Sequence, residues 1–330
     1  MRKIKIGQIG IGHNHGEAKI LAVRKFPELF EVVGYAEDDE EWIEKRAGLS
    51  AYEGLTRLTA DEVIERSDAV LVECDVWNLT KYAKKCIDAG KHVHIDKPAS
   101  GTLTEFKELV DLAQAKKLVV QLGYMYRYNP SVRELFRMVK DGELGTIHSV
   151  SAEMSTRHPD SYREWLRNFP GGNMYIFGSH LVDLIILLLG EPKSVSSTVV
   201  SSGISGIVSP DLTSATLIYD NAIARVFVSS VECNGWGRRC LSVAGSHGTV
   251  EIRPLEVPVR MTFAKRGEGG EYFDDYAKEL PTASVPDDMR YDEMVKEFYS
   301  AIIGEKENPY SYEHEYLLHK VLTEIVGGSC

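Results

Sequence analysis

A lysine beside a carboxylate stands where a strand ends, in the stretch Lys-His-Val-His-Ile-Asp-Lys-Pro at 91–98. Apolar residues alternate with polar neighbours there, which predicts a short strand. Pro98 has no backbone N–H and biases Lys97 toward an extended conformation, so we expect the strand to stop at Asp96 and Lys97. In an open parallel sheet the ligand cleft lies beyond the carboxyl ends of the strands. The pair therefore marks the edge of a ligand site; the alternative is an ordinary strand end with a solvated lysine.

A glycine-rich turn, Gly10-Ile-Gly-His-Asn-His-Gly16, follows an apolar stretch at 4–9 and precedes an amphipathic segment. Strand, turn and helix in this order are the setting of a dinucleotide-binding fingerprint. The first glycine permits the tight turn, and the second lets the backbone approach a pyrophosphate. The third glycine of the fingerprint is replaced by His15. We expect cofactor contacts from Gly10, Gly12, His13, Asn14 and His15.

The two histidines of this turn have two other interpretations. They are plain loop residues, or they bind a metal. A single His-x-His without a nearby pair of carboxylates gives little support for a metal, so none is expected.

An acidic run, Glu37-Asp38-Asp39, follows the second apolar stretch at 31–36. The fingerprint places an acid on the adenosine ribose about 20 residues after the glycines. No Arg or Lys occupies positions 37–41, so a 2′-phosphate would meet only negative charge. This favours NAD over NADP, with contacts from Glu37 and Asp38. The alternative is an acidic N-terminus for the next helix, which uses the same residues electrostatically.

Strand-like and helical stretches alternate over the first 123 residues, which predicts an α/β domain with a doubly wound parallel sheet at 1–123. Thr102 and Glu105 form a capping box for one of its helices. Residues 124–330 have a different pattern and predict an α+β domain with an open, mostly antiparallel sheet and helices on one face. Its expected elements are a helix at 130–140, strands at 146–156, 194–202, 212–219, 222–233 and 239–253, a polar loop at 265–288, and helices at 291–303 and about 313–326.

Composition excludes several classes of protein. A formal net charge of −11 disfavours a nucleic-acid or anionic-membrane partner, which would need a basic face. Five cysteines without a CxxC spacing favour reduced thiols in a cytoplasmic protein. The N-terminus becomes polar and glycine-rich too early for a signal peptide, and the longest apolar run, at 184–189, is too short to span a bilayer.

The stretch Gly-Gly-Asn-Met-Tyr-Ile-Phe-Gly-Ser-His-Leu-Val-Asp at 171–183 carries the strongest family signal. Together with the glycine-rich turn, Asp96-Lys97-Pro98 and Tyr126-Arg-Tyr-Asn-Pro130, it resembles the Gfo/Idh/MocA oxidoreductases over nearly the whole chain. That family includes glucose–fructose oxidoreductase and inositol dehydrogenase. The resemblance implies an N-terminal Rossmann domain that binds NAD(P), and a second domain whose open sheet often forms the oligomer interface. A homodimer or homotetramer through that sheet is expected.

The resemblance also implies roles for individual residues. Lys97 matches the catalytic lysine of the family, His180 its catalytic histidine, and Asp183 the acid three residues later. Oxidation of a secondary alcohol needs a base for the hydroxyl proton, which a neutral imidazole supplies, and a lysine stabilises the negative charge that develops on oxygen. Further cofactor contacts are expected from Cys74, Asp96 and Lys97 itself.

Two departures from the family pattern bear on this expectation. Many family dehydrogenases carry an aspartate four residues before the histidine, and here that residue is Ile176. Isoleucine cannot orient an imidazole, although Asp183 could substitute from one helical turn away. Asp75 and Leu79 stand where the family often has Pro and His, which would alter cofactor contacts.

A group of basic and aromatic residues precedes the Gly-Gly turn, namely Arg157, His158, Arg163, Trp165 and Arg167. It indicates a substrate with hydroxyls or a carboxylate. We expect substrate contacts from Tyr126, Arg157, Arg163, Trp165 and His180. The alternative is a solvated basic loop.

Three functions remain open from the sequence. The leading one is an NAD-dependent oxidoreductase that moves a hydride between nicotinamide and a hydroxyl carbon of a sugar, cyclitol or sugar acid. The second is a glycosidase-like enzyme that uses tightly held NAD for a transient oxidation. The third is a regulatory protein that keeps the fold and the nucleotide without turnover, an alternative that Ile176 favours.

Overall fold

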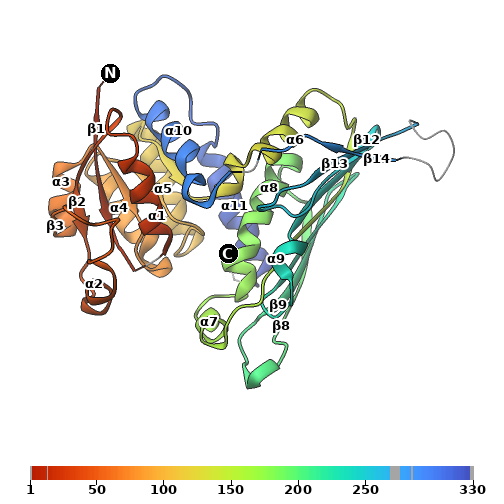
Figure 1. The fold of residues 1–330 in the computed structure, drawn as a ribbon, viewed down its shortest axis with the longest axis horizontal. Helices are drawn as coiled ribbons and strands as arrows, with labels where there is room; N and C mark the ends of the chain where they lie inside the picture. Colours follow the sequence, from red (N-terminus) through yellow and green to blue (C-terminus); the bar gives the residue numbers. More distant parts are fainter. Residues whose placement is uncertain (1, 13, 268–275, 284, 328–330) are drawn as a thin grey trace. The chain divides into compact units, whose positions relative to one another are not determined.

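The computed structural model describes residues 2–12, 14–267, 276–283 and 285–327, so His13 lies outside the described residues. The chain forms two compact units (Figure 1). The first comprises 1–125 and 287–319, and the second comprises 126–286 and 320–330.

The first unit contains a six-stranded parallel sheet in the order β3-β2-β1-β4-β5-β6. The predicted doubly wound parallel sheet is confirmed, and the short strand β3 is an addition to it. The strands are β1 (Ile4–Ile9), β2 (Phe30–Ala36), β3 (Arg57–Leu58), β4 (Ala69–Val72), β5 (His92–Ile95) and β6 (Val120–Leu122).

Helices follow the strands of this sheet as the alternating pattern predicts. They are α1 (Asn14–Arg24), α2 (Glu40–Arg46), α3 (Ala60–Arg66), α4 (Leu79–Asp88) and α5 (Leu103–Lys116), with short 3₁₀ turns at Val76–Asn78 and Met125–Tyr128. The predicted capping box of α5 is present: the Thr102 hydroxyl accepts from the Glu105 backbone N–H, and the Glu105 carboxylate accepts from that of Thr102. Phe106, Leu109 and Ala113 are buried on one face of the helix, as their spacing predicts.

A late segment of the chain completes the first unit. Helix α10 (Asp292–Ile302) and the start of α11 (Tyr312–Ile325) belong to it. The Asn308 amide donates to the backbone oxygen of Val120 at 2.9 Å, and the Tyr312 hydroxyl donates to that of Leu118 at 2.7 Å. The segment therefore binds β6 at the edge of the sheet. The first unit is discontinuous in sequence, whereas the predicted domains at 1–123 and 124–330 place this segment in the second domain.

The second unit contains an eight-stranded sheet in the order β14-β13-β12-β11-β7-β10-β9-β8, as predicted mostly antiparallel. Within this second sheet, β7 and β10 form the only parallel pair among the described strands. The strands are β7 (Ile147–Ser155), β8 (Ser194–Val200), β9 (Leu212–Ile218), β10 (Ile223–Ser229), β11 (Cys240–Gly245), β12 (Gly248–Ile252), β13 (Met261–Lys265) and β14 (Ala277–Leu280).

Two expectations about these strands were wrong. The stretch 239–253 is a hairpin of β11 and β12, because a turn at Ser246 and His247 interrupts it. The expected polar loop at 265–288 contains β14, whose polar residues are compatible with a largely exposed strand at the sheet edge.

Helices α6 (Pro130–Lys140) and α8 (Ser179–Leu189) lie on the same side of this sheet (Figure 1). The first two turns of α8 are buried, and the helix contacts β7 and β10. A π-helix at Met174–Gly178 leads directly into α8. The remaining helices are α7 (Asp160–Trp165) and α9 (Gly235–Arg238), with 3₁₀ turns at Leu166–Asn168, Ile204–Gly206 and, before α10, Asp287–Met289. No described helix has the length and apolar character needed to cross a membrane.

Candidate active site

A cavity of about 190 Å³ lies at the carboxyl ends of β1, β2 and β4. The strand order reverses between β1 and β4, which is where doubly wound sheets bind ligands. Its lining contains five of the residues predicted to contact the cofactor, Gly10, Gly12, Glu37, Asp38 and Cys74. Ile9, Ala36, Asp39, Trp42, Ala60, Asp75, Asn78 and Tyr82 complete the lining.

The two glycines of the turn are required by close neighbours. Gly10 has φ +93°, and a Cβ there would lie 2.3 Å from the Cys74 backbone. A Cβ on Gly12 would lie 2.7 Å from the Trp42 indole nitrogen. The glycine pattern therefore has a structural reason at both positions, and it leaves the backbone of the turn open toward the cavity.

The residues of the acidic run after β2 have different hydrogen-bond partners. Glu37 accepts the backbone N–H of Ile11 at 2.9 Å with one carboxylate oxygen, and those of Asp38 and Asp39 at 3.0 and 3.1 Å with the other. Asp39 caps α2 by accepting from the Glu41 backbone at 2.8 Å. The alternative of a helix N-terminus therefore describes Asp39. Asp38 is exposed at the cavity, where its contact with the cofactor stays a prediction.

Cys74 lines the cavity as a neutral thiol. Burial and the neighbouring carboxylate of Asp75 raise the pKa of its thiol. Burial, with the charge of Glu37, also raises the pKa of Asp75. The Cys74 thiol therefore stays neutral at physiological pH, and Asp75 is protonated more readily than an ordinary aspartate.

Lys97 follows the end of β5 and is only 4% exposed, so the alternative of a solvated lysine is wrong. The preceding carboxylate, Asp96, accepts from the Lys19 ammonium at 2.8 Å and lies 3.3 Å from His15 Nδ1. Lys19 also donates to Glu73 at 3.0 and 3.1 Å. Neither Lys19 nor Glu73 was recognised from the sequence, because each looks like an ordinary charged residue in its own element.

His94 lies beside this group of charges in β5. Its Nδ1 is 2.8 Å from the Gln121 side-chain oxygen, and its Nε2 lies 3.6 Å from Glu73. Burial and the charge of Lys19 lower the pKa of His94 to about 3. The imidazole is therefore neutral in the folded protein across the physiological range.

We expect this buried histidine to make the fold acid-sensitive. The unfolded chain protonates His94 below pH 6.5, and the folded chain does so only near 3, so its contribution is complete above pH 6.5 and is lost as the pH falls. At pH 5 the loss is about 2 kcal/mol. Urea unfolding of wild type and His94→Gln at pH 7 and pH 5 measures it. The variant should show a smaller loss than wild type, and equal losses would contradict the assignment.

His180 lies in the first turn of α8 and is 3% exposed. Its ring packs edge-on against Tyr126 with 5.2 Å between centroids, and the Tyr126 hydroxyl donates to Glu256. Glu256 also accepts from Arg239. The structure therefore brings together two residues predicted to contact substrate, and π-helical turns such as the one before α8 are frequent at functional sites.

Asp183 has a partner that the sequence did not reveal. Its two carboxylate oxygens accept from Arg127 Nε at 2.9 Å and Nη2 at 2.7 Å, and the side chains are 1% and 0% exposed. A two-pronged pair of this kind is strong and fixed in orientation. The structure therefore gives Asp183 a role in joining α8 to the turn that carries Tyr126.

The basic group before the Gly-Gly turn is not a solvated loop as a whole. Arg163 is buried, and its guanidinium donates to Asp211 at 2.6 and 2.9 Å, to Asp160 at 3.0 Å and to the Ile204 oxygen at 2.9 Å. Trp165 packs against Tyr162 and Phe169. Arg157 and Arg167 are exposed, the latter beside Glu164, so the solvated alternative describes these two members of the group.

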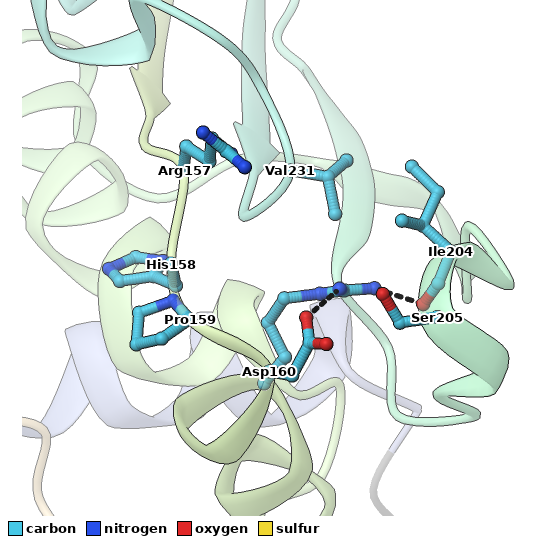
Figure 2. A pocket seen from close by; sticks show the side chains of 8 residues that line it. Arg157, His158, Pro159, Asp160, Ile204, Ser205 and Val231 are labelled. Carbon is cyan, nitrogen blue, oxygen red and sulfur yellow. Dashed lines mark hydrogen bonds and ion pairs between the residues drawn. The ribbon is translucent and has the colours of Figure 1, made fainter.

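Arg157 is exposed and lines a cavity of about 390 Å³ in the second unit. Figure 2 shows His158, Asp160, Ser205 and Val231 around the same hollow. His158 stacks on Tyr162 and on Phe177 of the π-helix, with centroids 4.7 and 4.8 Å apart. Burial and the charge of Arg239 lower the pKa of His158 to about 4, so a neutral aromatic wall connects this cavity to the segment that precedes His180.

The described residues contain no group of three or more His, Cys, Asp or Glu side chains arranged to hold a metal ion. His13, one of the two histidines considered as ligands, lies outside that part of the chain. The side chain of Asn14 is likewise not described, although its backbone begins α1.

Comparison with known families matches both units. Residues 4–124 match the profile described as "Oxidoreductase family, NAD-binding Rossmann fold", and residues 132–251 match the "GFO/IDH/MocA C-terminal domain". The chain belongs to the Gfo/Idh/MocA family. This confirms the resemblance drawn from the glycine-rich turn, the Asp-Lys-Pro stretch and the stretch at 171–183.

Relatives within the Gfo/Idh/MocA family act on several compounds. The chain is 27% identical over 150 residues to "scyllo-inositol 2-dehydrogenase (NADP(+)) IolW" of Bacillus subtilis, covering 44% of this chain and 41% of the relative. It is 27% identical over 192 residues to "Glucose-6-phosphate 3-dehydrogenase" of the same organism, covering 56% and 53%. The chain spans about half or less of the length of these curated relatives.

A solved structure of levoglucosan dehydrogenase in complex with NADH and levoglucosan has the same fold. It superposes with a TM-score of 0.82 over 98% of this chain and 96% of that one, at 18% identity. At that identity the similarity shows the fold alone. Ile176, which stands where the resemblance leads us to expect an acid, is buried in the π-helix and supplies no carboxylate.

Proposed function

We propose that this protein is an NAD-dependent oxidoreductase that transfers a hydride between nicotinamide and a hydroxyl carbon of a sugar, cyclitol or sugar acid. The observation that carries the proposal is the cavity at the switch point of the parallel sheet, which is lined by Gly10 and Gly12 of the glycine-rich turn and by the acidic run at 37–39. Membership of an oxidoreductase family supports the redox chemistry. The names of the relatives support a sugar-like substrate.

The charge of the cavity lining supports a dinucleotide without a 2′-phosphate. Its described lining carries four acids, Glu37, Asp38, Asp39 and Asp75, and no lysine or arginine. An exposed Asp38 carboxylate suits ribose hydroxyls as hydrogen-bond donors and repels a phosphate. Two relatives are named for NADP, so the preference is a property we assign to this chain from its own residues.

Each catalytic role follows from the chemistry of its side chain. The nicotinamide supplies a hydride acceptor when NAD is bound. In the proposed reaction, Lys97 donates a hydrogen bond to the substrate oxygen and stabilises the charge that develops there. The His180 imidazole accepts the hydroxyl proton. The Arg127–Asp183 pair holds α8, which carries His180, in place.

The preference for NAD is directly measurable. By calorimetry, wild type should bind NAD at least about tenfold more tightly than NADP, since one added repulsion of about 1.4 kcal/mol gives that factor. Asp38→Arg should lose most of this preference. The matched control is Glu44→Arg, on the exposed side of α2 and outside the cavity lining, which should keep it. Tighter binding of NADP by wild type would refute the proposal.

The substrate is best found by a thermal-shift screen of sugars, polyols and sugar acids with NAD present, followed by a turnover assay for NADH. A compound that both raises Tm and produces NADH supports the oxidoreductase. Cofactor that survives purification, with product formed and no net NADH, identifies the glycosidase-like alternative.

A regulatory protein is the second candidate, and the buried Ile176 favours it. It predicts that NAD and a sugar ligand bind together without turnover. Binding of both ligands with no product by mass spectrometry would move this function to first place.

A further inference from the structure

Three charged side chains form a buried cluster in the first unit: Lys19 of α1, Glu73 after β4 and Asp96 after β5. Their side chains are 0–2% exposed. The two carboxylates follow adjacent parallel strands, so the Lys19 ammonium bridges the carboxyl ends of both. Buried carboxylates are costly unless they are paired, which makes Lys19 the group on which this arrangement depends.

The cluster is closely surrounded. A Cβ on Gly123, which follows β6, would lie 2.6 Å from Lys19 Nζ and 3.2 Å from Asp96 Oδ1. The Tyr291 ring covers the ammonium, with its centroid 5.9 Å away. Lys19 therefore has little room for another side-chain conformation, and the Asp96 carboxylate has a fixed partner.

Asp96 connects the cluster to the residues proposed for catalysis. Its backbone N–H donates to Val72 at 2.9 Å, so strand pairing continues through it, and Lys97 is the next residue. Lys97 lies in the bend that follows β5, one residue beyond the carboxylate that Lys19 holds. Fixing the Asp96 carboxylate against α1 therefore fixes the backbone from which the Lys97 side chain projects. The same carboxylate contacts His15 of the glycine-rich turn.

Two carboxylates share one ammonium here. Burial and the charge of Asp96 raise the pKa of Glu73 to about 8. The neighbouring His94 is neutral, so it adds no positive charge. Glu73 is therefore protonated more readily than an ordinary glutamate, and Asp96 is held by contacts with both Lys19 and His15.

We propose that Lys19 is a positioning residue: by holding the Asp96 carboxylate it sets the orientation of Lys97 without touching the substrate. This inference rests on the proposed role of Lys97 in catalysis. In this inference Glu73, the second carboxylate, fills space beside Lys19 and balances its charge, and it does not orient Lys97.

The test uses Lys19→Met, which keeps the length of the side chain and removes its charge. We expect kcat to fall at least about tenfold while KM and the Kd for NAD change less than about threefold, because only the orientation of Lys97 is lost. The matched control, Glu73→Gln, keeps the contact between Lys19 and Asp96 and should stay within about threefold of wild-type kcat. Asp96→Asn should add little to Lys19→Met, since both remove the same contact. A Lys19→Met enzyme with wild-type kcat overturns the inference.

A second readout is independent of turnover. The rate at which an amine-acetylating reagent modifies Lys97 is followed by peptide mass spectrometry, with the exposed Lys140 as the internal standard. In Lys19→Met, the freed Lys97 side chain should be acetylated faster relative to Lys140 than in wild type. In Glu73→Gln, the ratio of the two acetylation rates should stay at the wild-type value. If wild type has no turnover, this shift still supports the positioning role while the proposed function fails. An unchanged rate in an active enzyme refutes the positioning role.

Loss of Lys19 leaves a buried charge unbalanced, so Lys19→Met alone is at risk of not folding. The double variant Lys19→Met/Glu73→Gln removes one group of each sign. The kcat of the double variant is compared with that of Glu73→Gln, and we expect it to be about tenfold lower. Equal kcat values in these two proteins overturn the inference.

Discussion

Lys97→Ala is expected to lose turnover while it binds NAD within about tenfold of the wild-type affinity. The ammonium is proposed to act on the reacting oxygen, where loss of one such donor typically lowers kcat by about 10²- to 10³-fold. The nucleotide cavity is lined by other residues, so the affinity for NAD depends little on this side chain. Steady-state kinetics on the substrate found by the screen, with calorimetry for NAD, measures both quantities.

The control for Lys97 is Lys140→Ala, an exposed lysine at the end of α6, which should retain wild-type kcat. His180→Ala should show the same separation of turnover from cofactor affinity, because its imidazole is proposed as the base. A Lys97→Ala protein with wild-type activity would show that the lysine is not at the reacting oxygen. Activity in both variants would refute the proposed mechanism.

Arg127→Met is expected to cost about 3–5 kcal/mol of unfolding free energy, because it leaves the Asp183 carboxylate buried without its charge partner. The two side chains are almost fully excluded from water and make two parallel hydrogen bonds. Chemical denaturation at neutral pH measures the loss. The double variant Arg127→Met/Asp183→Leu should recover most of it, since neither charge then remains.

Two comparisons make this result specific. Arg167→Met removes an exposed arginine that pairs with Glu164, and its Tm should stay near that of wild type. Asp183→Asn separates a structural role of this acid from a catalytic one. If the variant folds and loses far more kcat than Arg127→Met does, Asp183 acts in the reaction as the family resemblance implied. A stable Arg127→Met protein would contradict the importance of the pair.

The features that could be predicted from the sequence are those that neighbouring residues determine. The capping box of Thr102 and Glu105, the turn of Gly10 and Gly12, and the end of β5 ahead of Pro98 all depend on residues a few positions apart. The alternation of elements then gives the parallel sheet.

The features that could not be predicted depend on partners far apart in the chain. Lys19 meets its carboxylates 54 and 77 positions away, and Arg163 meets Asp211 48 positions away. A charged residue looks the same in the sequence whether it is solvated or paired in the interior. The sequence therefore predicts a substrate contact or a solvated residue at Arg163, and it gives no sign of the partners of Lys19.

The segment 287–319 also has a consequence for the order in which the protein is made on the ribosome. Strand β6 emerges before the groups that bind the backbone oxygens of Leu118 and Val120, which belong to Tyr312 and Asn308, 194 and 188 positions later. Until those residues are synthesised, the nascent Rossmann sheet presents an uncovered edge, which is the feature most prone to pairing with another chain. The first unit can therefore begin to fold before the second unit is synthesised, but it is completed only afterwards.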